Sequence, residues 1–437
     1  MIKKSCTLLV LAFLICKSLF AQQLAFPSAE GFGKHASGGR GGLVYVVTNL
    51  NDAGPGSLRK GILKKGPRII VFAVSGSIVL SSKLDINHGD LSIFGQTAPA
   101  GGITIIGYPV TIKSDNVILR YLRFRMGDVN GLEGDVLGCR NTTNVIIDHC
   151  SISWGTDENA SFYNNRNFTL QWSIVSEALN KSLHHKGAHG YGGIWGGVNV
   201  SFHHNLIASN NSRNPRFSGS ETTLNAAREF VDFRNNVIYN WGENSIYGGE
   251  NGRYNLVNNY FKPGPATPKS KLNRIISPSE PYGTFFVHGN YVQNRPDISA
   301  DNWSGGVQGK ITSAFRLEIP IDIENNTLTH SAHDAYSLVL QYAGCSRYRE
   351  VLDDRIIRNV REGSADFENG IINSQQDVGG FIEMPIQYGP ADQDADGIPD
   401  YWEVLQGLNP EQSDSNLFTL NTNYANVEVY ANTILID

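Results

Sequence analysis

Residues 145–153 read VIIDHCSIS, and this stretch decides the fold because its pattern recurs along most of the chain. Apolar residues occupy its first, third and eighth places, with polar residues between them. Residues 168–176 (FTLQWSIVS) and 200–208 (VSFHHNLIA) follow the same nine-residue template. An alternation with a period of two predicts a strand that buries one of its faces.

The template extends in both directions along the chain. It starts again at these residues: Leu91, Val117, Val231, Tyr254, Phe285 and Ile321. Successive starts lie 23 to 36 residues apart, which is a spacing typical of repeat proteins. One short strand per repeat, with no regular helical segment between repeats, predicts an all-β fold. We expect a single-stranded parallel β-helix over residues 22–387.

The sixth place of the template is the most regular one. From residue 200 onward it always holds asparagine: Asn205, Asn236, Asn259, Asn290 and Asn326. Equivalent places superpose in stacked coils, so these side chains can hydrogen-bond to one another in a buried ladder. A β-sandwich or a propeller with asparagine in its turns is the alternative. The position of asparagine inside the strand template favours the β-helix.

Three longer segments resemble one enzyme family. They are VIIDHCSISWGTDEN from Val145, SRNPRF from Ser212, and the opening AFPSAEGFGKHASGGRGGLVYVVTNLNDAGPGSLRKGI from Ala25. In this order they resemble the pectate lyases of polysaccharide lyase family 1. The resemblance is clear from Phe26 to Pro265 and implies a right-handed parallel β-helix. It also implies calcium-dependent cleavage of α-1,4-linked polygalacturonate by β-elimination, which leaves a 4,5-unsaturated product.

Acidic residues cluster before and after the strand at 145–153. Ca²⁺ takes six to eight oxygen ligands, usually including several carboxylates, although a solvated acidic surface would have the same spacing. In the family, calcium is held by an acidic-Gly-Asp motif and by acids one coil later. Glu133-Gly134-Asp135 matches the first element and Asp157 the second. Ser153 stands where many members of the family have a further acid.

Basic residues that match the family follow in two loops. Lys186, within the glycine-rich HHKGAHGYGG, resembles the lysine that grips a substrate carboxylate, and a solvated loop lysine is its alternative. Arg213-Asn214-Pro215-Arg216 resembles the catalytic Arg-x-Pro segment. The resemblance assigns the base to Arg213 and carboxylate binding to Arg216. Many members place that second arginine two residues later, where this chain has Ser218.

The implied chemistry explains why cations are needed. The C5 proton of galacturonate is α to its carboxylate, so its abstraction leaves an enolate-like anion that a metal and nearby cations stabilise. Arginine is an unusual base because its reference pKa is about 12.5 or more. We therefore expect activity to rise toward alkaline pH.

The end of the chain, residues 388–437, is predicted to be a separate calcium-binding tail. The run DQDADGIPDYWE fits a twelve-residue EF-hand loop, with Gly397 at its sixth place. The acids that fall at ligand places are Asp392, Asp394, Asp396, Asp400 and Glu403. The segment resembles the dockerin-like tails of secreted bacterial polysaccharide enzymes, and an acidic linker is its alternative.

Residues 1–21 read as a signal peptide, because Lys3 and Lys4 precede a short apolar run and Ala21 offers a cleavage site. We expect export, either to the periplasm or to the medium, with no membrane-spanning segment. The chain has 41 acidic and 36 basic residues, a balance that does not favour nucleic acid as a partner. The expected partner is polygalacturonate and the expected state is a monomer.

Three other functions are compatible with the same fold. A pectin lyase acting on methyl-esterified chains would not need the acids at 133, 135 and 157. A glycoside hydrolase would need two facing carboxylates, and the strands from Val200 onward offer no suitable pair. A non-catalytic carbohydrate-binding β-helix would have no reason to combine SRNPRF and Lys186 with an acidic cluster.

Overall fold

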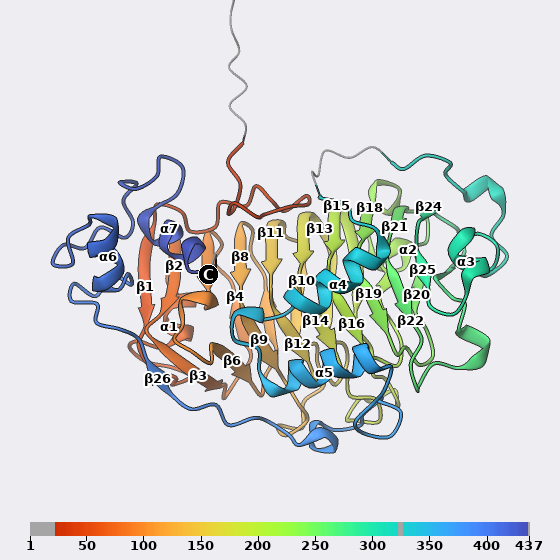
Figure 1. The fold of residues 1–437 in the computed structure, drawn as a ribbon, viewed down its shortest axis with the longest axis horizontal. Coiled ribbons are helices and arrows are strands. Elements are labelled where there is room, and N and C mark those ends of the chain that lie inside the picture. The colour runs from red at the N-terminus through yellow and green to blue at the C-terminus, as the bar shows by residue number, and fades with distance from the viewer. Residues whose placement is uncertain (1–21, 322–326, 436–437) are drawn as a thin grey trace, which may run out of the picture.

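The computed structural model describes residues 22–321 and 327–435, and within them the chain winds into a parallel β-helix (Figure 1). Each turn contributes strands that pair with the turns before and after it, so the strands form ladders along the long axis. The predicted fold class is confirmed.

Two of the ladders belong to one 16-stranded sheet, because the long strands β13 and β15 take part in both. The first ladder is β1 (Leu43–Val47), β2 (Arg68–Phe72), β5 (Leu91–Phe94), β8 (Val117–Arg120), β11 (Thr143–Asp148), β13 (Ala160–Gln171), β15 (Ile194–His203), β18 (Phe230–Arg234), β21 (Arg253–Val257) and β24 (Thr284–His288). The second is β4 (Leu84–Ile86), β7 (Val110–Ile112), β10 (Leu137–Arg140), β13, β15, β17 (Arg216–Phe217), β20 (Ile246–Gly248) and β23 (Ile276–Pro278). All of these pairings are parallel.

The third ladder is a separate sheet. It consists of β3 (Val74–Val79), β6 (Ile103–Ile106), β9 (Leu122–Arg125), β12 (Ser151–Ser153), β14 (Ile174–Ser176), β16 (Leu206–Ala208), β19 (Val237–Tyr239), β22 (Tyr260–Lys262) and β25 (Tyr291–Val292). One further strand, β26 (Gln387–Tyr388), pairs antiparallel with β3. The residues after the main coil therefore return to its amino-terminal end.

The repeating template is two strands with a corner between them, which corrects the expectation of one strand. In residues 145–153, β11 ends at Asp148 and β12 begins at Ser151. Of the two residues between them, His149 has a φ of 51°, and Trp172 (50°) and His204 (56°) occupy the same place in later coils. This left-handed conformation turns the chain from one sheet to the next. The sixth-place asparagine lies at the corner rather than within a strand.

The asparagine ladder is present at that corner. The Nδ2 of Asn205 donates to the Oδ1 of Asn236 at 3.0 Å, Asn236 donates to Asn259 at 3.1 Å, and Asn259 donates to Asn290 at 2.8 Å. Asn290 then donates to Asn302 at 3.0 Å. The expected last member, Asn326, and most of the template from Ile321 lie outside the described residues. Each side chain also receives a backbone N–H of the coil before it, so the corners are tied together.

An apolar core fills the inside of the coil and is closed at both ends. At the amino-terminal end α1 (Leu58–Ile62) buries Leu58 and Ile62 in the same cluster as Val47. At the other end α3 (Pro296–Ala300) contributes Ile298 to that cluster. A short helix, α2 (Gly219–Thr222), follows β17.

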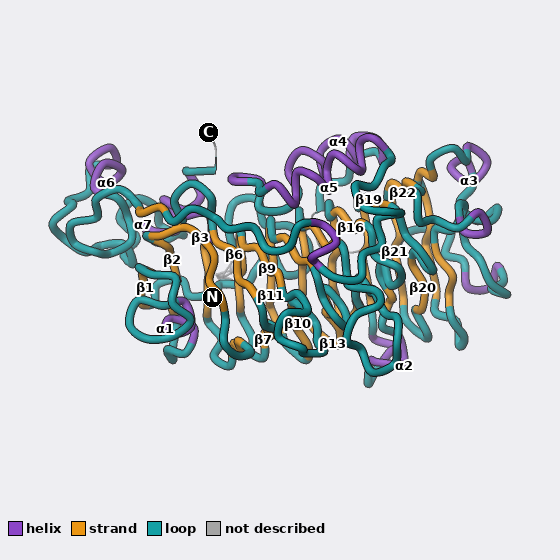
Figure 2. The backbone as a smooth tube through the Cα atoms, turned by 90° about the horizontal axis from the view of Figure 1, so that it is seen from below, coloured by secondary structure: helices purple, strands orange, loops and turns teal. Residues whose placement is uncertain are grey.

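Two later segments cover the outside of the coil (Figure 2). The helices α4 (Ala332–Tyr342) and α5 (Val351–Glu362) pack on the third ladder through a buried cluster that includes Leu206, Val339 and Ile356. The tail helices are α6 (Asp400–Gln406) and α7 (Asn426–Thr433). The tail lies on the outer face of the first ladder and shares a second cluster with Ile69, Val71 and Phe94. None of the helices in the described part of the chain has the length and apolarity needed to cross a bilayer.

Candidate active site

The residues predicted for catalysis meet at a cavity of about 500 Å³ beside the second ladder. It is lined by Glu133, Arg140, Asp157, Glu158, Tyr163, His184, His185, Lys186, Ala188, His189, Tyr191, Ile194 and Arg213. Four sequence-predicted residues are in this lining: Glu133, Asp157, Lys186 and Arg213. A fifth, Asp135, contacts the lining residues Arg140 and Glu158. They come from loops of different coils.

Neighbouring coils supply the site in register. Glu158 forms a parallel bridge with Tyr191, and Tyr191 forms another with Ser212. Adjacent strands lie about 4.8 Å apart, so Arg213 is two rungs from Glu158. This stacking explains why residues far apart in the sequence share one cavity.

Three carboxylates form the acidic side of the site. Oxygens of Asp135, Asp157 and Glu158 lie within 4.8 Å of one another. Burial raises the pKa of Asp135, and burial together with the charge of Asp135 raises the pKa of Asp157. Glu158 is only 3% exposed, and its Oε2 accepts a hydrogen bond from Ser161 at 2.9 Å. Crowded carboxylates of this kind are stabilised by a cation.

The donor set fits calcium. Ca²⁺ is a hard cation that binds carboxylate oxygens and completes its shell with carbonyls and water. Asp135, Asp157 and Glu158 would supply three such ligands on one face. Two of them, Asp135 and Asp157, were predicted from the sequence.

Glu133 is the predicted ligand that the structure places differently. Its carboxylate accepts hydrogen bonds from the backbone N–H of His185 at 3.0 Å and from the His185 ring at 2.8 Å, and these bonds lower the pKa of Glu133. The Nε2 of His184 also lies 3.3 Å from it. Glu133 therefore belongs to a histidine group beside the three carboxylates.

The same histidine group reaches Asp157. The Nε2 atoms of His184 and His189 lie 3.4 and 3.1 Å from its Oδ1. The two rings stack with their centroids 3.4 Å apart. Burial and the charge of His184 lower the pKa of His189 to about 4. His189 is therefore neutral at neutral pH and adds no charge to the site.

Arg213 is fixed by three neighbours. Its Nη1 forms an ion pair with Glu158, its Nε donates to the hydroxyl of Tyr247 at 3.3 Å, and its guanidinium lies 4.5 Å from the centroid of the Tyr191 ring. The backbone of Arg213 has a φ of 57°. The same left-handed conformation occurs at the corners of the coil, for example at His149 and His204.

The two other predicted basic residues have different surroundings. Lys186 is exposed and lines the cavity, and its role as a substrate ligand stays a prediction. Arg216 lies outside the lining. Its Nη2 binds Glu250 at 2.8 Å and its Nη1 donates to the carbonyls of Phe217 and Ser218 at 2.7 Å. Carboxylate binding by Arg216 stays a prediction, and it would require Glu250 to release this side chain.

Sequence reasoning counted Glu158 in the acidic cluster without choosing it as a ligand, and it assigned no role to Arg140. Glu158 follows Asp157 directly, and its place beside Arg213 depends on the register of two coils. Arg140 pairs with Asp135 and lies 4.8 Å from the centroid of the Tyr163 ring. Arg140 on β10 is in register with Tyr163 on β13. The strand pattern alone does not show this contact, because the alignment of the two strands is not known from the sequence.

A second cavity of about 540 Å³ borders the first at a shared lining residue. Arg140 lines both cavities, and the second is also lined by Asp135, Lys83 and Lys113. Lys113 pairs with Asp85 at 2.6 Å, and the two side chains are 50% and 32% exposed. A groove with exposed cations therefore runs across several coils.

The tail contains a second acidic group. Oxygens of Asp392, Asp394 and Asp396 lie within 4.8 Å of one another, as do those of Asp396, Glu403 and Asp414. Burial and neighbouring acids raise the pKa of Asp394 to about 6 and of Glu403 to about 7. Asp400, which the motif predicts as a ligand, instead accepts the backbone N–H of Gln393 at 2.7 Å. Asp414 was not predicted.

Fold and site together define a β-helix enzyme with an acidic and arginine-containing groove, and comparison with known proteins gives the family. No protein-family model matches the chain. The probable pectate lyase C of Aspergillus flavus is 35% identical over 429 residues, covering 94% of each chain. Among solved structures, a polygalacturonate lyase fused to a self-assembling amphipathic peptide has a TM-score of 0.53 at 15% identity, covering 76% of this chain and 100% of that one. A mutant pectate lyase of Bacillus subtilis has a TM-score of 0.51 at 14% identity, with the same coverage.

The chain belongs to the pectate lyase family, and it is a lyase. The solved structures share its fold, and the curated relative extends over nearly its full length.

Proposed function

We propose that the protein cleaves polygalacturonate by calcium-dependent β-elimination, with Arg213 as the base that removes the C5 proton. The observation that supports this most is the ion pair between Arg213 and Glu158, because oxygens of Asp135, Asp157 and Glu158 lie within 4.8 Å of one another. A base and a group of hard oxygen ligands are the two components that this reaction needs.

Glu158 is the residue whose partner must change during the reaction. A guanidinium that is bound to a carboxylate is held in its charged form, which cannot accept a proton. Glu158 also lies in the group that would hold Ca²⁺. We propose that Glu158 turns from Arg213 toward this group, which leaves Arg213 supported by Tyr191 and Tyr247.

Two exposed cations would bind substrate carboxylates. Lys186 lines the cavity from one loop, and Arg140 lies between this cavity and the next. Both cations would neutralise the carboxylate whose α-proton is removed or the carboxylates of neighbouring sugar units. Lys83 and Lys113 would extend binding along a longer chain.

Bound Ca²⁺ would act here as a Lewis acid that stabilises charge developing on the substrate carboxylate. The chain would supply Asp135, Asp157 and Glu158 to hold it. Glu133 would position His184 and His185 at the edge of the site.

We also infer that the protein is exported, because residues 1–21 have the organisation of a signal peptide. This segment lies outside the described residues. The proposed working form is a monomer with a coiled catalytic part at 22–387 and a tail at 388–437.

One assay tests the reaction. The protein is incubated with polygalacturonate, with calcium or with chelator, and ultraviolet absorbance of an unsaturated product is followed. We expect absorbance to rise with calcium and to stay flat with chelator. Reducing ends without absorbance would indicate a hydrolase. Activity with chelator, preferring methyl-esterified chains, would indicate a pectin lyase. The absence of any product would leave a carbohydrate-binding β-helix.

A further inference from the structure

The tail holds a group of five carboxylates that two separate segments supply. Asp392, Asp394, Asp396 and Glu403 come from the first segment, and Asp414 comes from the second. Asp396 links the two segments, because its Oδ2 accepts the backbone N–H groups of Asp414 and Ser415 at 2.9 and 2.8 Å. Five acids at one place repel one another unless a cation is bound.

Glu403 gives independent evidence of a ligand. Its side chain is 0% exposed. Neither of its carboxylate oxygens has a hydrogen-bond partner among the residues that the structure describes. The Oδ2 of Asp394 is also buried without a hydrogen-bond partner among these residues. A buried carboxylate without a partner is costly. A cation between Glu403, Asp394 and Asp396 would satisfy these oxygens.

The geometry differs from the twelve-residue motif at one position. The motif places a ligand at Asp400, whereas the Oδ1 of Asp400 is bound to the N–H of Gln393 at 2.7 Å. Asp414 lies 18 residues from Asp396 and enters the group instead. Its Oδ1 accepts a hydrogen bond from Asn426 at 3.1 Å, which orients the carboxylate.

The loop that carries these carboxylates also packs on the coil. Gly397, at the tip of the loop, packs so closely on β2 that an added Cβ would lie 2.5 Å from Val71. Its φ of 95° also favours glycine. Ile398 is buried in the same cluster as Val71. The packing of the loop on the first ladder therefore depends on the backbone conformation at Gly397 and on the burial of Ile398.

The second segment continues into α7, which is bound to the coil by three polar contacts. Glu428 pairs with Arg40 at 2.9 Å. Asn432 accepts a hydrogen bond from Arg120 at 2.8 Å, and the carbonyl of Ala431 accepts one from Gln96 at 3.5 Å. Movement of the second segment would loosen α7 and uncover the apolar outer face of the first ladder.

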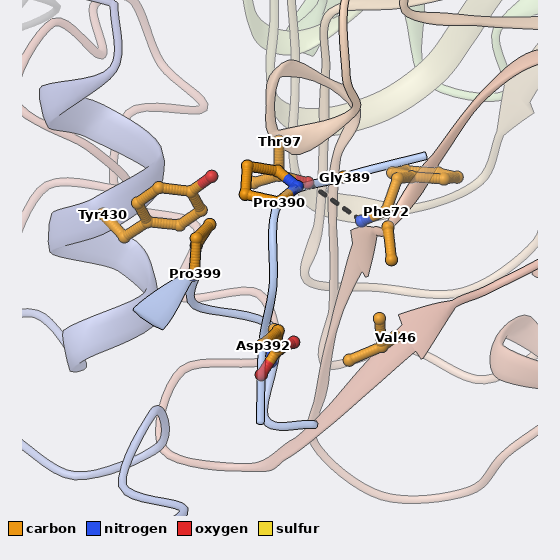
Figure 3. A pocket seen from close by; sticks show the side chains of 10 residues that line it. Val46, Phe72, Thr97, Gly389, Pro390, Asp392, Pro399 and Tyr430 are labelled. Atoms are coloured by element: carbon orange, nitrogen blue, oxygen red, sulfur yellow. Dashed lines mark hydrogen bonds between the residues drawn. The ribbon is translucent and has the colours of Figure 1, made fainter. Parts of the chain in front are cut away.

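Figure 3 shows the seam between the tail and the coil. Tyr430, Pro399 and Asp392 of the tail face Val46 and Phe72 of the coil, around a cavity of about 30 Å³. This volume is enough for about one water molecule. Beside this space, Ile398 and Trp402 of the tail are buried in one apolar cluster with Val71 of the coil.

We propose that Asp414 completes a Ca²⁺ site with Asp392, Asp394, Asp396 and Glu403, and that this site clasps the tail onto the first coils. All five ligands are carboxylates, which favours a hard cation such as Ca²⁺ over Zn²⁺. The bound ion joins the loop seated on β2 to the segment that leads into α7. Its role is structural and independent of the lyase reaction.

The test uses the full-length, tag-free protein and Ca²⁺ alone. Thermal unfolding is measured with calcium and with chelator for a parent protein and for its variants Glu403→Gln, Asp414→Asn and the matched control Asp400→Asn. All four carry Asp135→Asn, which weakens the catalytic site so that the tail dominates the shift. We expect calcium to raise the Tm of the parent by roughly 5 °C.

The variants distinguish the proposed ligand set, which includes Asp414, from the set of the twelve-residue motif, which includes Asp400. Glu403→Gln should lose the calcium shift while its Tm in chelator stays equal or rises, because a buried unpaired charge is removed. Asp414→Asn should lose most of the shift and Asp400→Asn should keep it. In chelator, proteolysis should cut the tail first. A parent without a calcium shift, a full shift in Glu403→Gln and Asp414→Asn, or loss of the shift in Asp400→Asn alone would overturn the proposal. Lyase activity is not a readout, so these outcomes do not depend on the reaction.

Discussion

Arg213 reaches across the ring of Tyr191 to form an ion pair with Glu158, a residue that precedes it by 55 positions. The contact spans two rungs of the coil. It joins the predicted base to the group of carboxylates that would hold calcium. Metal binding and the position of the base therefore depend on the same glutamate.

Glu158→Gln should raise the calcium concentration for half-maximal activity by about 10- to 100-fold, because it removes a charged ligand. The control is Glu250→Gln, which also breaks an arginine ion pair, with Arg216, but lies outside the carboxylate group. Initial rates are measured against calcium concentration. An unchanged calcium dependence in Glu158→Gln would remove Glu158 from the metal group.

Arg213→Lys should lower kcat by about 10²- to 10⁴-fold, since an ammonium cannot place a nitrogen where the guanidinium does. Arg216→Lys should keep kcat within a few fold. Rates against pH for both variants, with folding checked by circular dichroism, make the comparison. We expect wild-type activity to rise toward alkaline pH. A folded Arg213→Lys enzyme with normal kcat would leave the base unassigned.

Replacing Lys83 and Lys113 together by alanine should raise KM for long polygalacturonate roughly 2- to 10-fold and leave kcat unchanged, because exposed charges contribute modestly. A short uronate oligomer should show a smaller change. The control pair is Lys269→Ala with Lys310→Ala, two exposed lysines that do not line the groove. Equal effects in both pairs would point to general charge rather than to the second cavity.

Asn236→Ala should destabilise the coil by about 1–3 kcal/mol, because it leaves the buried N–H of Asn205 and the carbonyl of Phe202 without their partner. Asn225→Ala is the control, since that side chain is exposed, its backbone φ is −138°, and it makes no capping hydrogen bond. Denaturant unfolding measures both variants. Equal stability of the two would mean that the ladder adds nothing to the coil.

Asp148→Asn should destabilise the protein by about 3–5 kcal/mol at neutral pH, because Arg120 would remain buried without its charged partner. Burial alone would raise the pKa of Asp148, but His149 and Arg120 lower it below the usual value. This carboxylate therefore contributes stability above about pH 4 and loses it as the pH falls further.

Unfolding free energies measured between pH 7 and pH 3 test the direction of this pH dependence. Wild type should lose more stability than Asp148→Asn over this range. Parallel pH profiles for the two proteins would contradict the assignment.

The repeated template predicted the coil and the asparagine ladder because both depend on short-range patterns. The strand pairing and the contacts of Asn205, Asn236 and Asn259 confirm them. The corner at His149 was not predicted, because a left-handed residue between two strands leaves no clear signal when it is not glycine. The alternation continues through the corner and reads as a single strand.

The sequence by itself determined the repeating coil, the acids and arginines that the site needs, and the acidic loop of the tail. The tertiary structure decided which of them touch: Glu158 against Arg213, Glu133 against His185, and Asp414 beside Glu403 where the motif had placed Asp400. The physical reason is register. Spacings between template starts vary from 23 to 36 residues, so loop lengths do not fix which side chains face one another until the strands have paired.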